Sequence, residues 1–409
     1  MSILQDIRSQ PTCSVAGFGR VFYGASDRLY FSQVFIDDLT SLARCYQRND
    51  PTAEIANDIL DTDGGEILLQ ESGAIINMVK FHTGILLMCQ KGVWFLSGPD
   101  GGFTATAYKL DRLSGDRIVG TRAFCEVKSS VFFGTPDGIN TVSINEFGQP
   151  VVNSVTEQTV RSYWQDFVSD SIQMAHDEKE DRVYILRCSC PEGRVLVYDM
   201  KLNAFFPWKI GGSPPVDGEE IIYEGLFYSK KQQKMIFCAR KLGTMGSITR
   251  IYTAHQVKQA VHKDFNRESY YSYLVTNYET LGNYSRNKGA PLINVMMRKT
   301  EEQITEFDAG TKTYSFDNPS GVKMSVLWDW NTESSPRRKT DVKNIYKPVP
   351  RWFIPESIPS VFDTGETIIT YKDKVRGKGR AVQFKFEADG DKSMELLGFS
   401  VTFSSKGRS

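Results

Sequence analysis

The 409-residue chain has little histidine and no excess of charge of either sign. It contains four histidines, and its 49 basic residues balance its 49 acidic residues. A protein that holds nucleic acid through phosphates over a large surface is normally basic. The balance therefore excludes a broad electrostatic nucleic-acid interface, and any contact with DNA must be local or loose.

Signatures of metal sites, disulfide frameworks and membrane spans are also lacking. The seven cysteines are scattered, and Cys188 and Cys190 have C-x-C spacing, unlike the C-x-x-C of zinc or redox sites. No apolar run approaches the ~20 residues that a membrane-spanning helix needs. We therefore expect reduced, buried thiols, no metal site and no membrane-spanning segment.

Catalytic motifs are missing as well. The sequence has no G-x-S-x-G, no phosphate-binding loop and no H-E-x-x-H. Residues 100–104 partly match the Asp-box of sialidase propellers, but Gly98 and Ala105 replace its Ser and Trp. That box is in any case a turn element. We predict no catalytic residue, no cofactor and no enzymatic activity.

What the sequence does contain is a recurring hairpin pattern, in which two apolar runs flank a turn with glycine. Copies occupy residues 17–32, 84–98, 130–144 and 181–199. The last three recur at roughly 45–50 residues, which is the period of propeller blades. The repeat therefore indicates a β-propeller, a fold that usually serves as a scaffold.

From this pattern we predict an all-β chain in three parts. Residues 1–16 form an N-terminal arm, residues 17–270 a β-propeller, and residues 271–409 an additional β-rich C-terminal region. A long loop rich in proline and charge interrupts the last part at 331–359. Such loops are usually functional or bound to a partner.

Helix signals are sparse. Residues 36–46 give the best local match to a period of 3.6 residues. Residues 163–176 fit either a connecting strand or a short helix. Neither segment changes the all-β prediction.

A basic stretch near the C-terminus supplies the first candidate contacts, Lys374, Arg376, Lys378 and Arg380. Because these residues alternate, a single strand would place all four on one face. They either contact DNA or an acidic neighbour, or they charge a solvated strand edge against aggregation. The intervening Gly377 and Gly379 favour a bulge or a close backbone approach.

A second basic cluster, Arg337, Arg338 and Lys339, lies in the 331–359 loop. It is a further candidate for a channel or subunit contact, and the alternative is a solvated loop. The same loop is our candidate for reaching a neighbouring subunit or another protein of the assembly.

In their order along the chain, these patterns resemble the nozzle proteins of short-tailed bacteriophages, also called tail tubular protein B. Each pattern is hydrophobic alternation with glycines, so their order carries the resemblance. The matching stretches lie within 19–32, 75–81, 86–103, 114–115, 131–139, 181–208 and 374–399.

The resemblance implies a structural virion protein of the phage tail that is assembled in the host cytoplasm. Such proteins form a homo-oligomeric, hexameric ring below the tail adaptor. The ring extends the DNA channel, retains the packaged genome and lets it pass at ejection without sequence-specific contacts. The implied partners are the adaptor, other tail proteins and genomic DNA. The alternative is a propeller-type tail protein that binds or hydrolyses glycans, with acids and aromatics in a funnel at one propeller face.

Overall fold

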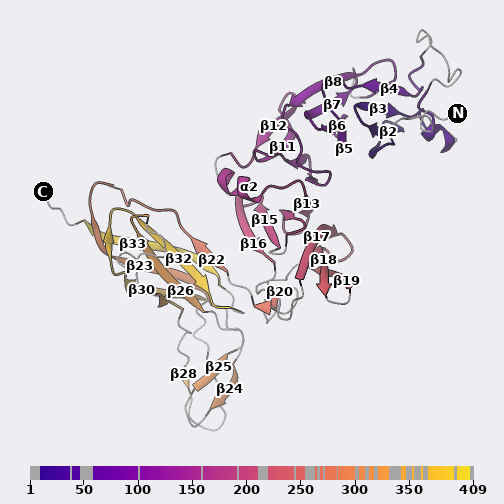
Figure 1. Ribbon diagram of the computed structural model, residues 1–409. Helices are drawn as coiled ribbons and strands as arrows, with labels where there is room; N and C mark the ends of the chain where they lie inside the picture. Colours follow the sequence, from indigo (N-terminus) through magenta and orange to yellow (C-terminus); the bar gives the residue numbers. More distant parts are fainter. Residues whose placement is uncertain are drawn as a thin grey trace. The chain divides into compact units, whose positions relative to one another are not determined.

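The structure is a computed structural model of the chain (Figure 1). It describes residues 10–36, 39–46, 59–99, 102–157, 160–190, 193–210, 220–243, 246–253, 263–264, 268–269, 272–282, 284–299, 304–308, 313–316, 321–330, 342–346, 352–353, 361–362, 367–390 and 394–405. Strands dominate these residues, and the prediction of an all-β chain is confirmed.

The chain divides into two compact units. One comprises residues 1–210 and 214–254, and the other comprises residues 211–213 and 255–409. The boundary that we predicted at residue 270 therefore falls inside the second unit. The sequence did not reveal the division because strand-like alternation continues on both sides of it.

The first unit is a succession of antiparallel sheets whose strands follow one another in chain order. The first four sheets have four strands each, and the fifth has three in the described residues. Such meanders are the blades of a β-propeller, as predicted. The strands are β1 (Cys13–Gly17), β2 (Arg20–Ala25), β3 (Arg28–Phe31) and β4 (Gly65–Leu68); β5 (Ile75–Phe81), β6 (Gly84–Cys89), β7 (Gly92–Ser97) and β8 (Lys109–Ser114); β9 (Phe124–Val127), β10 (Ser130–Gly134), β11 (Ile139–Ile144) and β12 (Pro150–Ser154); β13 (Ile172–Asp177), β14 (Arg182–Arg187), β15 (Arg194–Asp199) and β16 (Ala204–Lys209); and β17 (Glu220–Ser229), β18 (Lys234–Gly243) and β19 (Gly246–Thr253).

At three of the four junctions, successive blades pack through their first strands: β1 contacts β5, β9 contacts β13, and β13 contacts β17. The second and third blades meet through their last strands, β8 and β12. The largest core cluster spans the second, third and fourth blades, and another joins the first blade to the second. Between the third and fourth blades, Trp164 of helix α2 (Arg161–Phe167) is fully buried and donates its indole N–H to the Thr135 carbonyl at 2.9 Å. The blades are therefore joined by shared apolar cores.

The predicted hairpins are the second and third strands of the first four blades, and their pairing confirms them. The predicted arm is partly wrong, because residues 13–17 form strand β1 and pair with β2. Within 36–46, the described residues contain only a short 3-10 helix, η1 (Leu39–Ala43). For residues 163–176 we predicted either a connecting strand or a short helix, and the structure has both: the end of α2 and then β13.

The second unit contains two sheets with a common core. One has the order β22 (Tyr273–Val275), β32 (Val382–Ala388), β26 (Val322–Trp328) and β27 (Lys343–Asn344). In the other, the long strand β23 (Lys288–Arg298) pairs with β30 (Ile368–Lys374), β31 (Lys378–Gly379) and β33 (Leu396–Ser405). Side chains of β23, β26 and β32 fill the core between them. Short pairs complete the unit: β20 (Lys263–Asp264) with β21 (Glu268–Ser269), β24 (Ile304–Asp308) with β25 (Thr313–Phe316), and β28 (Trp352–Phe353) with β29 (Val361–Phe362).

The predicted 331–359 loop is not a loop throughout. Residues 342–346 are described, and within them β27 pairs with β26. Ile345 and Tyr346 are 0 % and 3 % exposed in the core of the second unit. Two charged and polar residues, Lys343 and Asn344, precede them, so the alternating apolar pattern of a strand is missing from the sequence. Deleting 331–359 would therefore remove core residues along with any partner contact.

Candidate functional site

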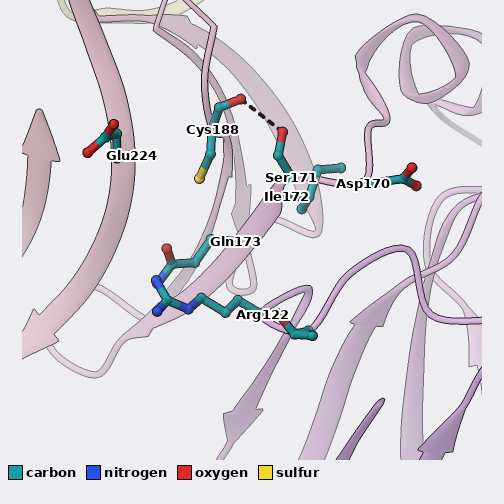
Figure 2. Close-up of a pocket in the computed structure, with 8 residues that line it drawn as sticks. Arg122, Asp170, Ser171, Ile172, Gln173, Cys188 and Glu224 are labelled. Atoms are coloured by element: carbon teal, nitrogen blue, oxygen red, sulfur yellow. Dashed lines mark hydrogen bonds between the residues drawn. The ribbon is translucent and has the colours of Figure 1, made fainter. Parts of the chain in front are cut away.

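A cavity of about 170 Å³ lies among the third, fourth and fifth blades (Figure 2). The contacts between β9, β13 and β17 bring its walls together. Figure 2 shows the Arg122 guanidinium beside the Gln173 side chain, while Asp170 points away from both. The lining residues are Thr121, Arg122, Asp170, Ser171, Ile172, Gln173, Cys188 and Glu224.

The polar groups of this cavity are held by the adjoining strands. Gln173 on β13 donates its Nε2 to the Leu226 carbonyl of β17 at 2.7 Å. Its Oε1 is buried without a protein hydrogen-bond partner. Ser171 donates its hydroxyl to the Cys188 carbonyl at 3.0 Å. The cavity is therefore polar, with one buried acceptor left for a water molecule or a small donor.

Cys188 is the one thiol in the lining. Burial raises the pKa of its thiol to about 11, with Arg122 opposing and Glu224 adding to the shift. The thiol is therefore protonated at neutral pH, whereas a reactive cysteine needs a lowered pKa. The lining contains two acids, Asp170 and Glu224, and no aromatic ring. It thus lacks the mixture of acids and aromatics that a glycan-hydrolysing propeller would present.

No pattern in the sequence groups these residues. Only Cys188 stood out, and only for its spacing from Cys190. The others come together through contacts between blades, which have no linear signature. In the described part of the chain, no group of three or more His, Cys, Asp or Glu side chains is placed to hold a metal ion.

The predicted basic stretch, residues 374–380, belongs to the second unit and is not a single strand. Strand β30 ends at Lys374, and Val375 then turns into the core. Gly377 has a φ of +116°, and only Lys378 and Gly379 return to the sheet as β31. All four basic side chains are nevertheless exposed.

The expected close backbone approach in this stretch is confirmed. A Cβ atom at Gly377 would lie 2.2 Å from Nε1 of Trp328, and one at Gly379 would lie 2.8 Å from the Asp329 carboxylate. The Asp329 carboxylate also accepts the backbone N–H of Arg380 at 2.6 Å. The buried Lys288 donates its Nζ to the Arg380 carbonyl at 2.9 Å. Contacts with Trp328, Asp329 and Lys288 thus hold the backbone of residues 377–380 in place, while the cationic side chains are exposed.

An acid network adjoins this stretch. Asp373 accepts hydrogen bonds from Lys343 at 2.6 Å and from the Tyr371 hydroxyl at 2.9 Å. These two bonds, with that from the Lys374 backbone, lower the pKa of Asp373 to about 2. Burial and the same carboxylate raise the pKa of Tyr371 to about 12. The negative charge of Asp373 is therefore already engaged inside the protein.

The second predicted cluster, Arg337, Arg338 and Lys339, lies outside the described residues. Among the residues that are described, no helix is long and apolar enough to cross a membrane.

Comparisons with known proteins identify no family for this chain. No family model matches the chain, and no curated protein matches it. Among solved structures, it is similar to the WD40 domain of SCAP from fission yeast, with a TM-score of 0.21, 9 % identity and coverage of 91 % of this chain and 82 % of that one. It is also similar to PorZ, a surface component of the type-IX secretion system of Porphyromonas gingivalis, with a TM-score of 0.17, 11 % identity and coverage of 82 % and 47 %. Such loose alignments give no ground for transferring a function.

Proposed function

We propose that this chain is a structural subunit of a bacteriophage tail nozzle, which assembles into a ring around the DNA channel. The proposal rests on the order of the sequence patterns that resemble this family. It is supported by the succession of antiparallel blades followed by a separate β-rich unit. A scaffold of packed sheets would suit a conduit, because the outer faces of the sheets would remain for contacts between subunits.

The charge balance agrees with this role. Equal numbers of acidic and basic residues leave the chain without a net positive charge, which fits a conduit, because a strongly basic wall would bind the phosphates of passing DNA and slow its ejection. The exposed residues Lys374, Arg376, Lys378 and Arg380 would make the local, sequence-independent contacts with DNA or with an acidic neighbour. The ring would stand in the virion tail, with the tail adaptor as its neighbour.

Electron microscopy of the purified full-length protein tests the proposal, alone and mixed with the adaptor protein of the same phage. We expect sixfold rings with an open axial channel. Analytical ultracentrifugation of the same samples gives the mass of the assembly independently. Monomers under all conditions, including with the adaptor, would overturn the proposal.

A further inference from the structure

The second unit carries an aromatic cluster at its surface that its core does not use. Trp330 and Tyr284 are each 53 % exposed, and their ring centroids lie 5.8 Å apart. The ring of Tyr278 lies 5.4 Å from that of Trp330. None of the three belongs to the core cluster of this unit. Grouped aromatic rings at the surface commonly mark a binding site.

The backbone holds Trp330 outwards at an energetic cost. Asp329 and Trp330 have φ values of +53° and +57°, in the left-handed region that bulky residues rarely adopt. The turn is kept by Asp329, which donates its N–H to the Ala381 carbonyl at 3.0 Å and accepts the Ala381 N–H on its carboxylate at 3.1 Å. Backbone strain of this kind persists only where surrounding contacts hold the residue in place. Strained residues are concentrated at active sites and ligand-binding sites.

A basic side chain, that of Arg380, lies beside the cluster. The Arg380 guanidinium lies 5.9 Å from the centroid of the Tyr284 ring. Arg286, Arg376 and Lys378 are close in sequence to these residues and are exposed. The nearby Asp329 carboxylate is engaged by two backbone N–H groups. The charge presented beside the rings therefore favours an anionic ligand.

We propose that Trp330, Tyr284 and Arg380 bind an acidic oligosaccharide. The C–H groups on one face of a pyranose ring are apolar and weakly positive, so they pack against the negative face of an aromatic ring. The Arg380 guanidinium pairs with a carboxylate of the sugar through charge-assisted hydrogen bonds.

The arrangement of charges distinguishes this ligand from single-stranded nucleic acid. Bases also stack on aromatic rings, but each nucleotide brings a phosphate, and the strand needs a basic groove along its backbone. Here the Arg380 guanidinium contacts one ring of the cluster, that of Tyr284, whereas Arg286, Arg376 and Lys378 are near the cluster in sequence only. A ligand with several ring faces and few charges fits better. This inference shares Arg380 with the contacts proposed for the nozzle, but it does not require that the chain forms a ring.

Calorimetric titration of the full-length protein tests the site. The probes are three acidic saccharides (oligogalacturonate, oligomannuronate and oligosialic acid), the neutral maltohexaose and a single-stranded oligothymidylate. We expect at least one acidic saccharide to bind more tightly than the other two probes. The Trp330→Ala substitution should weaken that binding by about tenfold or more, which corresponds to the loss of one good stacking contact.

Matched variants separate binding from folding. Trp330→Phe keeps an aromatic ring and should retain most of the affinity, whereas Arg380→Gln should weaken binding and reduce its dependence on salt. Trp208→Ala removes a 38 % exposed tryptophan on β16 of the first unit and should leave binding unchanged. The proposal is overturned if none of the three acidic saccharides binds at millimolar concentration, if oligothymidylate binds more tightly, or if Trp208→Ala weakens binding as much as Trp330→Ala does.

Discussion

Gly377 shows how strictly a single position can be constrained by its surroundings. Its φ of +116° is unfavourable for any residue with a side chain, and the space beside it is filled by the indole of Trp328. The Trp328 indole cannot move away from a side chain added at position 377, because Trp328 is fully buried and donates its N–H to the Arg376 carbonyl at 3.4 Å. The glycine is therefore required both by the backbone angle and by packing.

We predict that Gly377→Ala lowers the free energy of unfolding of the second unit by about 2–4 kcal/mol, from backbone strain and overpacking together. Urea unfolding followed by circular dichroism measures the loss. Gly282→Ala is the matched control, because Gly282 has a φ of +88° but no atom within 4 Å of the added Cβ. The control should lose only the strain contribution, and equal losses in the two variants would contradict the role of Trp328.

At the scale of strands, burial determines which strands could be predicted from the sequence. The second strands β6, β10 and β14 are buried along nearly their whole length, so they appear as continuous apolar runs. The outer strands β8, β12 and β16 are half exposed, and β1 has small side chains. The repeat that identified the blades was therefore the central hairpin, and the strands around it were harder to find.

The candidate sites were less predictable for the same physical reason. Exposed charged residues such as Lys374 and Arg380 can be predicted directly from the sequence. The neighbouring glycines, Gly377 and Gly379, indicated that other groups lie close to the backbone of this stretch. Which groups those charges face depends on contacts between distant strands. The pairing of Arg380 with Tyr284, and the position of Gln173 beside Arg122, result from tertiary packing and have no local pattern.

Asp373 makes an interaction between strands that depends on pH. Lys343 on β27 and Asp373 on β30 belong to different sheets of the second unit, and their side chains are 30 % and 39 % exposed. The folded pKa of about 2 lies below the value of about 4 expected for an unfolded aspartate. The carboxylate therefore stabilises the fold above pH 4, and this contribution is lost as the pH falls through the folded pKa.

We predict that Asp373→Asn makes the stability of the second unit less sensitive to acid. Between about pH 5 and pH 2 the wild-type protein should lose more free energy of unfolding than the variant, because the asparagine does not titrate. Solvent screening of this partly exposed pair makes the difference modest. Urea midpoints measured across this range test it, with Glu146→Gln, an exposed carboxylate on the turn between β11 and β12, as the control. Parallel pH profiles for the wild type and Asp373→Asn would be incompatible with the lowered pKa.

The whole molecule contains two kinds of β architecture, each with its own core. Phe133 on β10 lies in the largest core cluster of the first unit, and Phe386 on β32 lies in that of the second. Both side chains are fully buried. No residue is shared between these clusters, so each core should stabilise its own unit.

The last prediction tests this independence. Phe133→Ala should destabilise the first unit by about 3–5 kcal/mol, and Phe386→Ala should destabilise the second by a similar amount, because each leaves a cavity in a separate core. Hydrogen exchange with mass spectrometry follows peptides from the two units in the same full-length sample. We expect Phe133→Ala to accelerate exchange in β10 and β11 while leaving β26 and β32 unchanged, and Phe386→Ala to do the reverse. If either substitution accelerated exchange equally in both units, the two would unfold as one cooperative body, and the division near residue 254 would have no energetic meaning.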